Sequence, residues 1–374
     1  MNPKVSAAAL AVMAAAALTG CKTSEKTPLD YDALATKVEA RIFKMDTHSH
    51  VDVNMAQDEP PTPIVSLDSS LAKAGMDGIV MTFAVDYVAM GGNGNKQYDA
   101  YGRFSTALAE QDRILSYNHI DRTLNGRDIQ KNIAAGRPVI IQSVEGAHFL
   151  EGDTTRLREA YRRGLRILGL LHDTDASPAL GDIYTNEPKF GGLTEFGAAT
   201  IRESERLGML VDLAHADDNT VRAALKIATK PVIISHTGLN TRLGTNEKLG
   251  KMMYPRLISK EMATEVARKG GVIGVWPHLA FSAAEYAANI KALVDVVGID
   301  HVTIGTDTKI TPEIPMGNRP KKDEPKGQNH VWKDEPTNFY HATIRELLKL
   351  GYSEKDIAKI CGGNFIRIFT QATK

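Results

Sequence analysis

The sequence predicts an α/β fold built as one (β/α)8 TIM-like barrel, which we place at residues 31–374. Short apolar runs rich in β-branched residues alternate with longer segments of helical periodicity, and this alternation indicates a parallel sheet covered by helices. Eight such units fit into a chain of 374 residues, of which 43% are hydrophobic and 24% charged, as is typical of globular proteins. These observations favour one barrel with inserted loops over two smaller domains.

The expected strands are short and mostly apolar. In chain order they are Phe43–Thr47, Gly78–Ala84, Val139–Val144, Arg166–Leu171, Met209–Leu213, Val232–Ser235, Val272–Trp276 and Val302–Thr306. Arg113–Asn118 is also strand-like, so the number of strands could be larger by one. Apolar residues three or four positions apart predict helices between the strands, of which the clearest are Leu193–Leu207, Asn219–Ala228, Ser259–Lys269 and Ala283–Val297.

Two longer segments interrupt this alternation. Asp86–Arg103 contains three closely spaced glycines, and Thr311–Pro336 contains five prolines and the charged run Lys321–Glu324. The first is interpreted either as a loop that folds over a pocket or as a flexible surface excursion. The second is interpreted either as a lid or interface loop or as a solvated insertion.

The N-terminus is interpreted as a targeting signal. Lys4 precedes an apolar run, Ala7–Leu18, which has the length of a signal-peptide core and is too short to span a bilayer. The run ends in Leu18-Thr19-Gly20-Cys21, which resembles a bacterial lipobox. The resemblance implies a lipoprotein signal peptide at residues 1–20 and lipidation of Cys21.

Residues 21–30 are polar and are expected to form a flexible tether. Lys22 follows the cysteine where Asp would favour retention at the inner membrane, so we expect a lipid anchor in the bacterial cell envelope, at the outer membrane facing the periplasm or the cell surface. The alternative is an ordinary cleaved signal peptide with a chance cysteine.

Charge and cysteine content exclude several classes of protein. The 45 Lys and Arg residues balance 45 Asp and Glu residues and no basic stripe stands out, which argues against nucleic acid as a partner. The only cysteines are Cys21 and Cys361, so the chain can build neither a disulfide scaffold nor a cysteine zinc cluster. Any metal must therefore be held by histidine and carboxylate.

Candidate metal ligands and proton carriers follow six of the eight expected strands. In a (β/α)8 barrel all strands end at the same face, so residues far apart in the sequence meet there. A lone histidine at a strand end is usually a hydrogen-bonded loop residue, but such an explanation would have to hold at every strand end at once. The residues are His48 and His50, Glu145, His172, His215, His236 and Asp307.

These residue types suit a pair of divalent cations. A carboxylate can bridge two ions while neutral imidazoles fill the remaining ligand positions, and Glu145 is the natural bridge. Alternate residues of a strand share a face, so His48 and His50 can bind the first ion together. His215 and His236 are expected at the second ion. We expect two Zn²⁺ per chain, although such a site also accepts Mn²⁺ or Co²⁺.

Two further residues have expected catalytic roles. Asp307 is expected to contact the metals and to take a proton from a metal-bound water. His172 could donate a hydrogen bond to the oxyanion of a tetrahedral intermediate. The other histidines are interpreted as structural or surface residues: His119, His148, His278, His301, His330 and His341.

The motifs around these residues resemble the membrane (renal) dipeptidase family, peptidase family M19, within the amidohydrolase-like superfamily. The resemblance covers about residues 40–370 and rests on the order and spacing of several motifs. They are Ser143-Val144-Glu145-Gly146, Gly164-Leu165-Arg166 leading to Leu171-His172, Gly192–Gly197, Leu207–His215, Pro231–His236, Gly270–Val275, Gly305-Thr306-Asp307 and Gly362–Arg367.

The resemblance implies a zinc-dependent (β/α)8 hydrolase that cleaves dipeptides and tolerates a D-residue on the C-terminal side. It further implies a binuclear centre bridged by Glu145, with His215 and His236 at the second zinc and His172 in contact with substrate. Arg256 lies where the family has an arginine that binds the substrate carboxylate, and Arg242 is the competing candidate.

The sequence departs from the family pattern at three places. The first strand of the family usually ends in His-x-Asp, whereas this chain has His48-x-His50, and a shift of two residues to His50-x-Asp52 would restore the pattern. We favour His48 and His50 because Asp46-x-His48 matches the start of the family motif. The family tends to continue with Phe-Asp-Gly after the residue matching Asp307, where this chain has Thr308-Lys309-Ile310, and it often has Asn within the segment 173–175, which reads Asp-Thr-Asp here.

The hypothesis is therefore a metallo-dipeptidase in which a hydroxide bridging two metals attacks the peptide carbonyl. Asp307 moves the proton to the leaving amine, His172 polarises the carbonyl, and Arg256 or Arg242 holds the terminal carboxylate. One alternative is another binuclear amidohydrolase, such as a lactonase, phosphotriesterase or amidase, which His48-x-His50 favours. A second is a catalytically silent surface lipoprotein that acts as a binding module. The expected partners are a dipeptide and, through the anchor, a membrane; a homodimer is left open.

Overall fold

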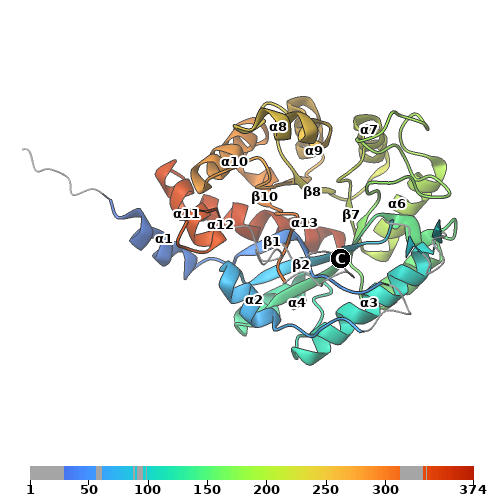
Figure 1. Cartoon of the computed structure of the whole chain (residues 1–374), viewed down its shortest axis with the longest axis horizontal. Helices are drawn as coiled ribbons and strands as arrows, with labels where there is room; N and C mark the ends of the chain where they lie inside the picture. Colours follow the sequence, from blue (N-terminus) through green and yellow to red (C-terminus); the bar gives the residue numbers. More distant parts are fainter. Residues whose placement is uncertain are drawn as a thin grey trace, which may run out of the picture. The chain divides into compact units, whose positions relative to one another are not determined.

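A ring of parallel strands forms a TIM-like barrel in the computed structural model (Figure 1). The structure describes residues 29–55, 61–86, 89–90, 96–97, 99–311, 332–333 and 335–374. The expected signal peptide, the lipidation site Cys21 and most of the tether lie outside the described residues, as does nearly all of segment 311–336. These expectations stay predictions.

The main sheet has the order β10-β9-β8-β7-β6-β5-β2-β1-β11, and its pairings are parallel. Its strands are β1 (Met45–His50), β2 (Gly78–Ala84), β5 (Val139–Glu145), β6 (Ile167–Gly169), β7 (Leu210–Asp212), β8 (Ile233–Thr237), β9 (Val272–Val275), β10 (Val302–Ile304) and β11 (Thr308–Lys309). Each of the eight expected strands coincides with one of these. A short antiparallel pair, β3 (Ala89–Met90) and β4 (Lys96–Gln97), lies outside the barrel sheet.

β10 and β11 are two parts of the last barrel strand, and together they close the ring. β10 pairs with β9, whereas β11 pairs with β1. Between them, the Thr47 hydroxyl donates to the Ile304 carbonyl at 2.8 Å and the Asp307 N–H donates to the His48 carbonyl at 3.0 Å. The first and last strands are therefore hydrogen-bonded to each other three residues before Asp307 and again at Asp307 itself.

Helices surround this ring. They are α1 (Tyr31–Glu39), α2 (Leu67–Ala74), α3 (Ala100–Tyr117), α4 (Gly126–Ala134), α5 (Arg156–Arg162), α6 (Glu195–Leu207), α7 (Asp218–Ile227), α8 (Glu247–Met253), α9 (Lys260–Arg268), α10 (Ala283–Val297), α11 (Phe339–Lys349), α12 (Glu354–Ala358) and α13 (Asn364–Ala372). Short 3₁₀ turns are η1 (Ala147–Leu150), η2 (Tyr254–Arg256) and η3 (Ile299–His301), and a π-turn, η4 (Lys359–Gly363), precedes α13.

The four helices expected from periodicity are confirmed as α6, α7, α9 and α10. The strand interpretation of Arg113–Asn118 is wrong, because these residues form the last turn of α3 and its C-cap. Ile114 and Leu115 are buried there on the inner side of the helix. The loop expected at 86–103 is also shorter than predicted, because α3 begins at Ala100.

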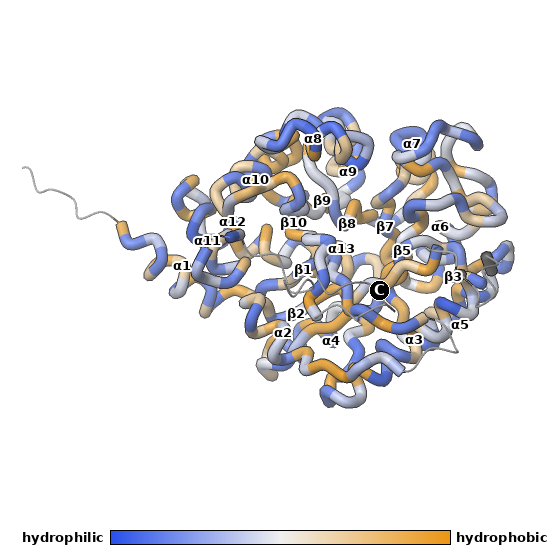
Figure 2. Tube along the Cα trace, in the orientation of Figure 1, coloured by the Kyte–Doolittle hydropathy of each residue, from blue (hydrophilic) through white to orange (hydrophobic). Residues whose placement is uncertain are grey.

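Two apolar layers hold the barrel, and most strands are correspondingly hydrophobic (Figure 2), with β1 and β11 as polar exceptions. The larger layer lies between the strands and the helices. The smaller one fills one end of the barrel, where strand residues such as Val80, Ile141 and Leu210 pack with Phe365 and Phe369 of α13. Because α13 closes the amino ends of the strands, the carboxyl ends are left for polar side chains.

Two strands are paired irregularly near this polar end, which changes the direction of their side chains. The register of β1 against β2 shifts between Asp46 and Ser49, and that of β8 against β9 shifts between Ile234 and Thr237. Strict alternation would place Met45 and His48 on opposite faces, yet Met45 packs in the inner apolar layer while His48 lies in the polar cluster. A bulge of this kind turns successive side chains toward one face.

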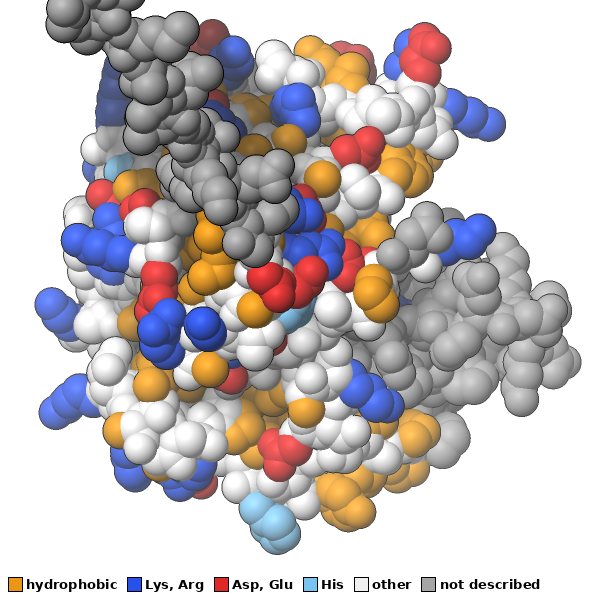
Figure 3. All heavy atoms as spheres, turned by 90° about the vertical axis from the view of Figure 1, so that its left-hand side faces the viewer, with side chains coloured by type: hydrophobic (Ala, Val, Ile, Leu, Met, Phe, Trp, Pro, Cys, Tyr) orange, Lys and Arg blue, Asp and Glu red, His pale blue; other side chains and the backbone are white. Residues whose placement is uncertain are grey.

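The surface carries both signs of charge side by side on the face shown in Figure 3, in line with the balanced composition. Within the part of the chain that the structure describes, no helix combines the length and the apolar character needed to cross a bilayer.

Candidate metal centre

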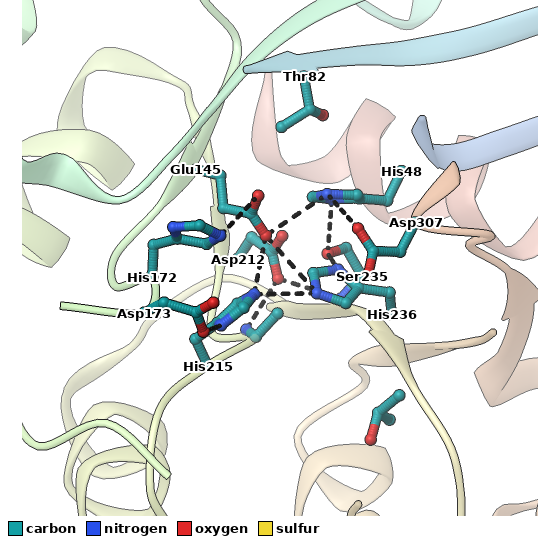
Figure 4. A network of polar contacts seen from close by, with 12 residues as sticks. His48, Thr82, Glu145, His172, Asp173, Asp212, His215, Ser235, His236 and Asp307 are labelled. Atoms are coloured by element: carbon teal, nitrogen blue, oxygen red, sulfur yellow. Dashed lines mark hydrogen bonds and ion pairs between the residues drawn. The ribbon is translucent and has the colours of Figure 1, made fainter. Parts of the chain in front are cut away.

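The six predicted metal ligands meet at the carboxyl ends of the barrel strands, and all of them except His50 are labelled in Figure 4. β1 supplies two histidines, β5 ends in the glutamate, and the remaining three follow or end β7, β8 and β10. The structure thus brings together His48, His50, Glu145, His215, His236 and Asp307.

Glu145 lies at the centre of this cluster, and its two oxygens face different histidines. Oε1 is 2.8 Å from Nε2 of His215 and 3.5 Å from Nε2 of both His48 and His236. Oε2 is 3.3 Å from Nε2 of His172 and 3.9 Å from Nε2 of His50. The carboxylate is almost fully buried, and its distances to these histidines allow it to contact both sides of the cluster at once.

Two groups of three ligands share this carboxylate. His48, His50 and Glu145 form one, and Glu145, His215 and His236 form the other, with the ligand atoms of each group within 4.8 Å of one another. Nε2 of His215 also lies 3.1 Å from Nε2 of His236, so these two nitrogens lie side by side next to Glu145. Imidazole and carboxylate in this arrangement are the ligands that Zn²⁺ takes at bridged two-metal sites.

One of the histidine nitrogens that face the centre lacks a hydrogen-bond partner among the described residues. Nε2 of His48 is buried and has no hydrogen-bond partner among the described residues, although it lies 3.5 Å from Glu145. A buried polar atom without a partner is costly, and a cation would satisfy it. In three of the histidines the other ring nitrogen, Nδ1, contacts a side chain outside the cluster. Ser235 contacts Nδ1 of His48 and of His236, and Asp173 contacts Nδ1 of His215. The residues therefore fit a pair of metal ions.

Ser235 connects the two ligand groups. Its hydroxyl lies 3.1 Å from Nδ1 of His48 and 2.8 Å from Nδ1 of His236, one histidine from each group. Its N–H donates to Asp212 at 3.0 Å. A Cβ at Gly274 or Gly305 would lie only 1.9 or 1.8 Å from the Ser235 carbonyl oxygen, so glycine is required at both positions to let the three strands approach. The backbone of Ser235 is thus in close contact with Asp212, Gly274 and Gly305.

Ser235→Ala is expected to weaken cation binding at both positions by roughly 10- to 100-fold, because each histidine loses the partner that fixes its tautomer. Titration with a competing chelator would measure the two affinities. Ser235→Thr, which keeps the hydroxyl, should retain them, and Ser204→Ala in α6 is the control for a buried serine remote from the cluster. Unchanged affinities in Ser235→Ala would show that the hydroxyl does not position the ligands.

Charges in the cluster are strongly coupled. Burial by itself lowers the pKa of His215, but the charge of Glu145 and the hydrogen bond to Asp173 outweigh it and raise the pKa to about 10. For His50, burial is outweighed by the hydrogen bond with Asp307 and by the charge of Glu145, and the pKa rises to about 9. Burial and the charge of His48 hold the pKa of His236 well below its usual value.

Cation loading at pH 7 is therefore expected to release protons, about two per chain, because His215 and His50 are protonated there and must give up a proton to bind a metal through Nε2. Since both pKa values are raised, affinity should fall as the pH is lowered and level off only above about pH 9 to 10. Calorimetric titration in buffers of different ionisation enthalpy counts the protons. A binding heat that does not depend on the buffer would contradict this protonation state.

Asp307 lies between two histidines. Oδ1 is 3.1 Å from Nε2 of His50, and Oδ2 is 3.2 Å from Nε2 of His278. Burial raises the pKa of Asp307, but the charge of His236 and the hydrogen bonds from His278 and His50 outweigh it and hold the pKa well below its usual value. Asp307 is thus ionised at neutral pH and can accept a proton. The ring of His278, interpreted from the sequence as structural or surface, thus contacts this carboxylate.

His172 is held by a second carboxylate. Its Nδ1 is 2.7 Å from Oδ1 of Asp86. The other oxygen of Asp86, Oδ2, accepts hydrogen bonds from the N–H and the hydroxyl of Thr174. Nε2 is thereby directed toward Oε2 of Glu145. Burial lowers the pKa of His172, but the charge of Glu145 and the hydrogen bond with Asp86 outweigh it and raise the pKa, which favours the protonated ring.

Of the two candidate arginines, the structure brings Arg256 to the cluster. Its Nη2 lies 3.3 Å from both carboxylate oxygens of Asp173, and Asp173 in turn contacts His215. The alternative, Arg242, is not supported: its side chain is exposed and its Nε donates to Asn289 on α10 at 2.9 Å. Arg242 lies in the loop that follows β8. Arg256 lies in η2, and its backbone carbonyl accepts a hydrogen bond from the hydroxyl of Thr237 at the end of β8.

The alternative ligand Asp52 points to a different partner. Its Oδ2 accepts a hydrogen bond from Nζ of Lys309 at 2.9 Å, whereas His48 and His50 both face Glu145. The register pairs His50 with Lys309 across β1 and β11, which places the lysine beside the cluster. The arrangement therefore favours His48 and His50 over His50 and Asp52.

Backbone strain coincides with the cluster at two points. His215 has φ +67° and Asp307 has φ +52°, a region that residues with a Cβ seldom adopt. His119 and Glu151 share this feature elsewhere, so positive φ alone does not mark a site. At His215 and Asp307, however, the turn directs the side chain of a strand end back over the barrel mouth.

Asp86, Asp173, Ser235 and His278 were not predicted as members of the site. Asp86 and His278 follow β2 and β9, the two strands for which no site residue was expected, so all eight strand positions contribute to the cluster. Extending the strand-end rule by two or three residues would have found both.

The chain is similar to known hydrolases in sequence and in fold. A family model described as "Membrane dipeptidase (Peptidase family M19)" matches residues 35–374. Dipeptidase 3 of Macaca fascicularis is 28% identical over 244 residues, which are 62% of this chain and 44% of that protein. Dipeptidase 3 of Mus musculus is 27% identical over 289 residues, which are 74% of this chain and 50% of that protein. The matched region is thus about half the length of these relatives.

Two solved structures share the fold. An amidohydrolase from Pseudomonas aeruginosa has a TM-score of 0.69 and 19% identity, with 91% of this chain and 99% of that chain covered. A metallo peptidase from Rhodobacter sphaeroides, solved with a phosphinate mimic of the dipeptide L-Ala-D-Ala, has a TM-score of 0.60 and 15% identity, with 88% and 99% covered.

Proposed function

Because the chain belongs to the membrane dipeptidase family, peptidase family M19, we propose that it is a zinc-dependent dipeptidase that hydrolyses the peptide bond of dipeptides. The observation that carries the proposal is the buried Glu145 carboxylate shared by two groups of histidines. Two Zn²⁺ ions held there would act as Lewis acids toward the carbonyl and would acidify water.

The residues around the cluster have matching roles. His172, whose Nδ1 is held by Asp86, is placed to donate a hydrogen bond from Nε2 to the carbonyl oxygen as it gains negative charge. Asp307, ionised and hydrogen-bonded by two histidines, is placed to accept the proton of the attacking water and to deliver it to the leaving amine. Arg256 is placed to hold the terminal carboxylate.

A cavity of about 50 Å³ adjoins this arrangement and supports a small substrate. His215, His236, Tyr184 and Arg256 line it on one side, and the rest of the lining is largely apolar, with Val221, Ile258 and Met262. Such a space fits a short side chain next to the carboxylate-binding arginine. We infer a dipeptide with a small C-terminal residue, tolerated in the D configuration.

Turnover of a dipeptide library by metal-analysed protein tests the proposal, with L-Ala-D-Ala and L-Ala-L-Ala as the first pair. About two zinc ions per chain and activity that a chelator abolishes would support it. Metal-free, inactive protein would instead support the silent binding module.

A second candidate is another binuclear amidohydrolase, because His50 replaces the carboxylate that the family usually has and so makes the first cation position less negative. A simple lactone and a phosphotriester, assayed beside L-Ala-D-Ala, separate the two functions. Faster turnover of either would favour this second candidate.

We further propose that Cys21 carries a lipid anchor in the bacterial envelope. Cys21→Ala is expected to shift the protein from the membrane fraction to the soluble fraction after cell lysis.

A further inference from the structure

Asp173 gives Arg256 a carboxylate partner within the chain. It follows His172 directly, and both of its oxygens lie 3.3 Å from Nη2 of Arg256. Oδ1 is also 3.2 Å from Nδ1 of His215. The side chains of Asp173 and Arg256 are 30% and 27% exposed, so molecules entering from solvent can reach both.

Arg256 is itself held in place. Its carbonyl accepts a hydrogen bond from the Thr237 hydroxyl at 2.8 Å, one residue after His236. Its guanidinium carbon lies 5.7 Å from the centre of the Tyr184 ring. Arg256 also supplies the positive charge in the lining of the small cavity beside His215 and His236.

The geometry of this ion pair leaves room for a third group. A single guanidinium nitrogen meets both carboxylate oxygens, whereas the strongest arginine–carboxylate pairs use two parallel N–H donors. A second carboxylate can therefore still approach the guanidinium. It would meet a pair of charges that largely cancel, and its attraction to the site would be correspondingly weak.

We propose that Asp173 determines specificity by acting as the counter-ion of Arg256, so that the site accepts dipeptides with a neutral C-terminus, such as amides, nearly as well as free acids. This inference rests on the proposed function, since it takes Arg256 as the group that meets the C-terminal end of the substrate. The substrate class is thereby widened to short peptides with a blocked C-terminus.

The test compares kcat/KM for L-Ala-D-Ala with kcat/KM for its C-terminal amide. Both substrates use the same metal centre, so a change in metal occupancy cancels in the ratio, even though Asp173 also contacts His215. Asp173→Asn is expected to raise the acid-to-amide ratio by roughly tenfold or more, because the guanidinium loses its counter-ion. Arg256→Met should lower the ratio below that of the unmodified chain.

Asp175→Asn is the matched control. Asp175 is two residues away, is exposed to a similar degree, and contacts Lys189 instead of Arg256. Its substitution removes the same charge and should leave the ratio within twofold. A ratio that Asp173→Asn also leaves within twofold overturns the inference, while dipeptide turnover by the unmodified chain keeps the proposed function intact.

Binding gives the same comparison without turnover. Calorimetric affinities of D-alanine and D-alaninamide for the cation-loaded chain, measured for both variants, report the preference for a carboxylate directly. A rise in this preference in Asp173→Asn alone supports the counter-ion role of Asp173 even if neither peptide is hydrolysed, whereas the absence of hydrolysis refutes the dipeptidase proposal. Equal preferences in both variants overturn it.

Discussion

Glu145→Gln is expected to lower dipeptide turnover by more than about 100-fold, because the amide removes the one negative charge that both histidine groups share. The loss should extend to metal content, with at least one of the two cations lost, since a neutral amide oxygen is a poor bridge between divalent ions. Steady-state kinetics and metal analysis on the same preparation measure both effects.

The control for this substitution is Glu205→Gln, at another buried glutamate. Glu205 accepts hydrogen bonds from the backbone of Thr229 and Lys230, away from the cluster. Its substitution is expected to lower the melting temperature while leaving turnover per folded chain unchanged. Near-normal turnover in Glu145→Gln would refute the bridging role and with it the two-cation centre.

Asp307→Asn is expected to lower kcat by roughly 100-fold or more, with a smaller change in KM, because an amide cannot accept the proton of the attacking water. The amide has nearly the shape of the carboxylate, so the fold around β10 and β11 should persist, although only one of His50 and His278 keeps an oxygen to which it can donate. A loss of kcat with retained metal content would separate the proton-transfer role of Asp307 from a role as a ligand.

Asp300→Asn provides the matched change at the surface, where Asp300 pairs with Lys359. If Asp307→Asn retained more than about a tenth of the activity, another group would have to move the proton. His278, which lies 3.2 Å from the Asp307 carboxylate, would be the first residue to examine.

Much of the site could be predicted because barrel geometry does not depend on loop details. Once eight strands are assigned, their carboxyl ends must open at one face, and residues such as His215 and Asp307 are assigned to one cluster despite their separation in the sequence. The composition added that any metal ligand had to be histidine or carboxylate.

Other features depend on contacts that periodicity does not encode. His48 and Asp52 lie on the same face of an ideal strand, and only the register shift in β1 and the pairing of Asp52 with Lys309 distinguish them. Likewise, Arg242 and Arg256 both follow β8, and only the structure shows that Arg256 is hydrogen-bonded to Thr237 through its carbonyl whereas Arg242 contacts Asn289.

By itself, the sequence determined the barrel, the strand ends that carry chemistry and the residue types available to hold cations. It could do so because an apolar run or a helical periodicity is a local property of one segment, which does not depend on the contacts of that segment. The tertiary structure alone decided that Ser235 contacts a histidine of each group, that Asp86 and His278 contact His172 and Asp307, and that Asp173 forms an ion pair with Arg256. These are contacts between side chains on different strands and loops, and their distances are set by bulges, glycine packing and loop paths that no single segment specifies.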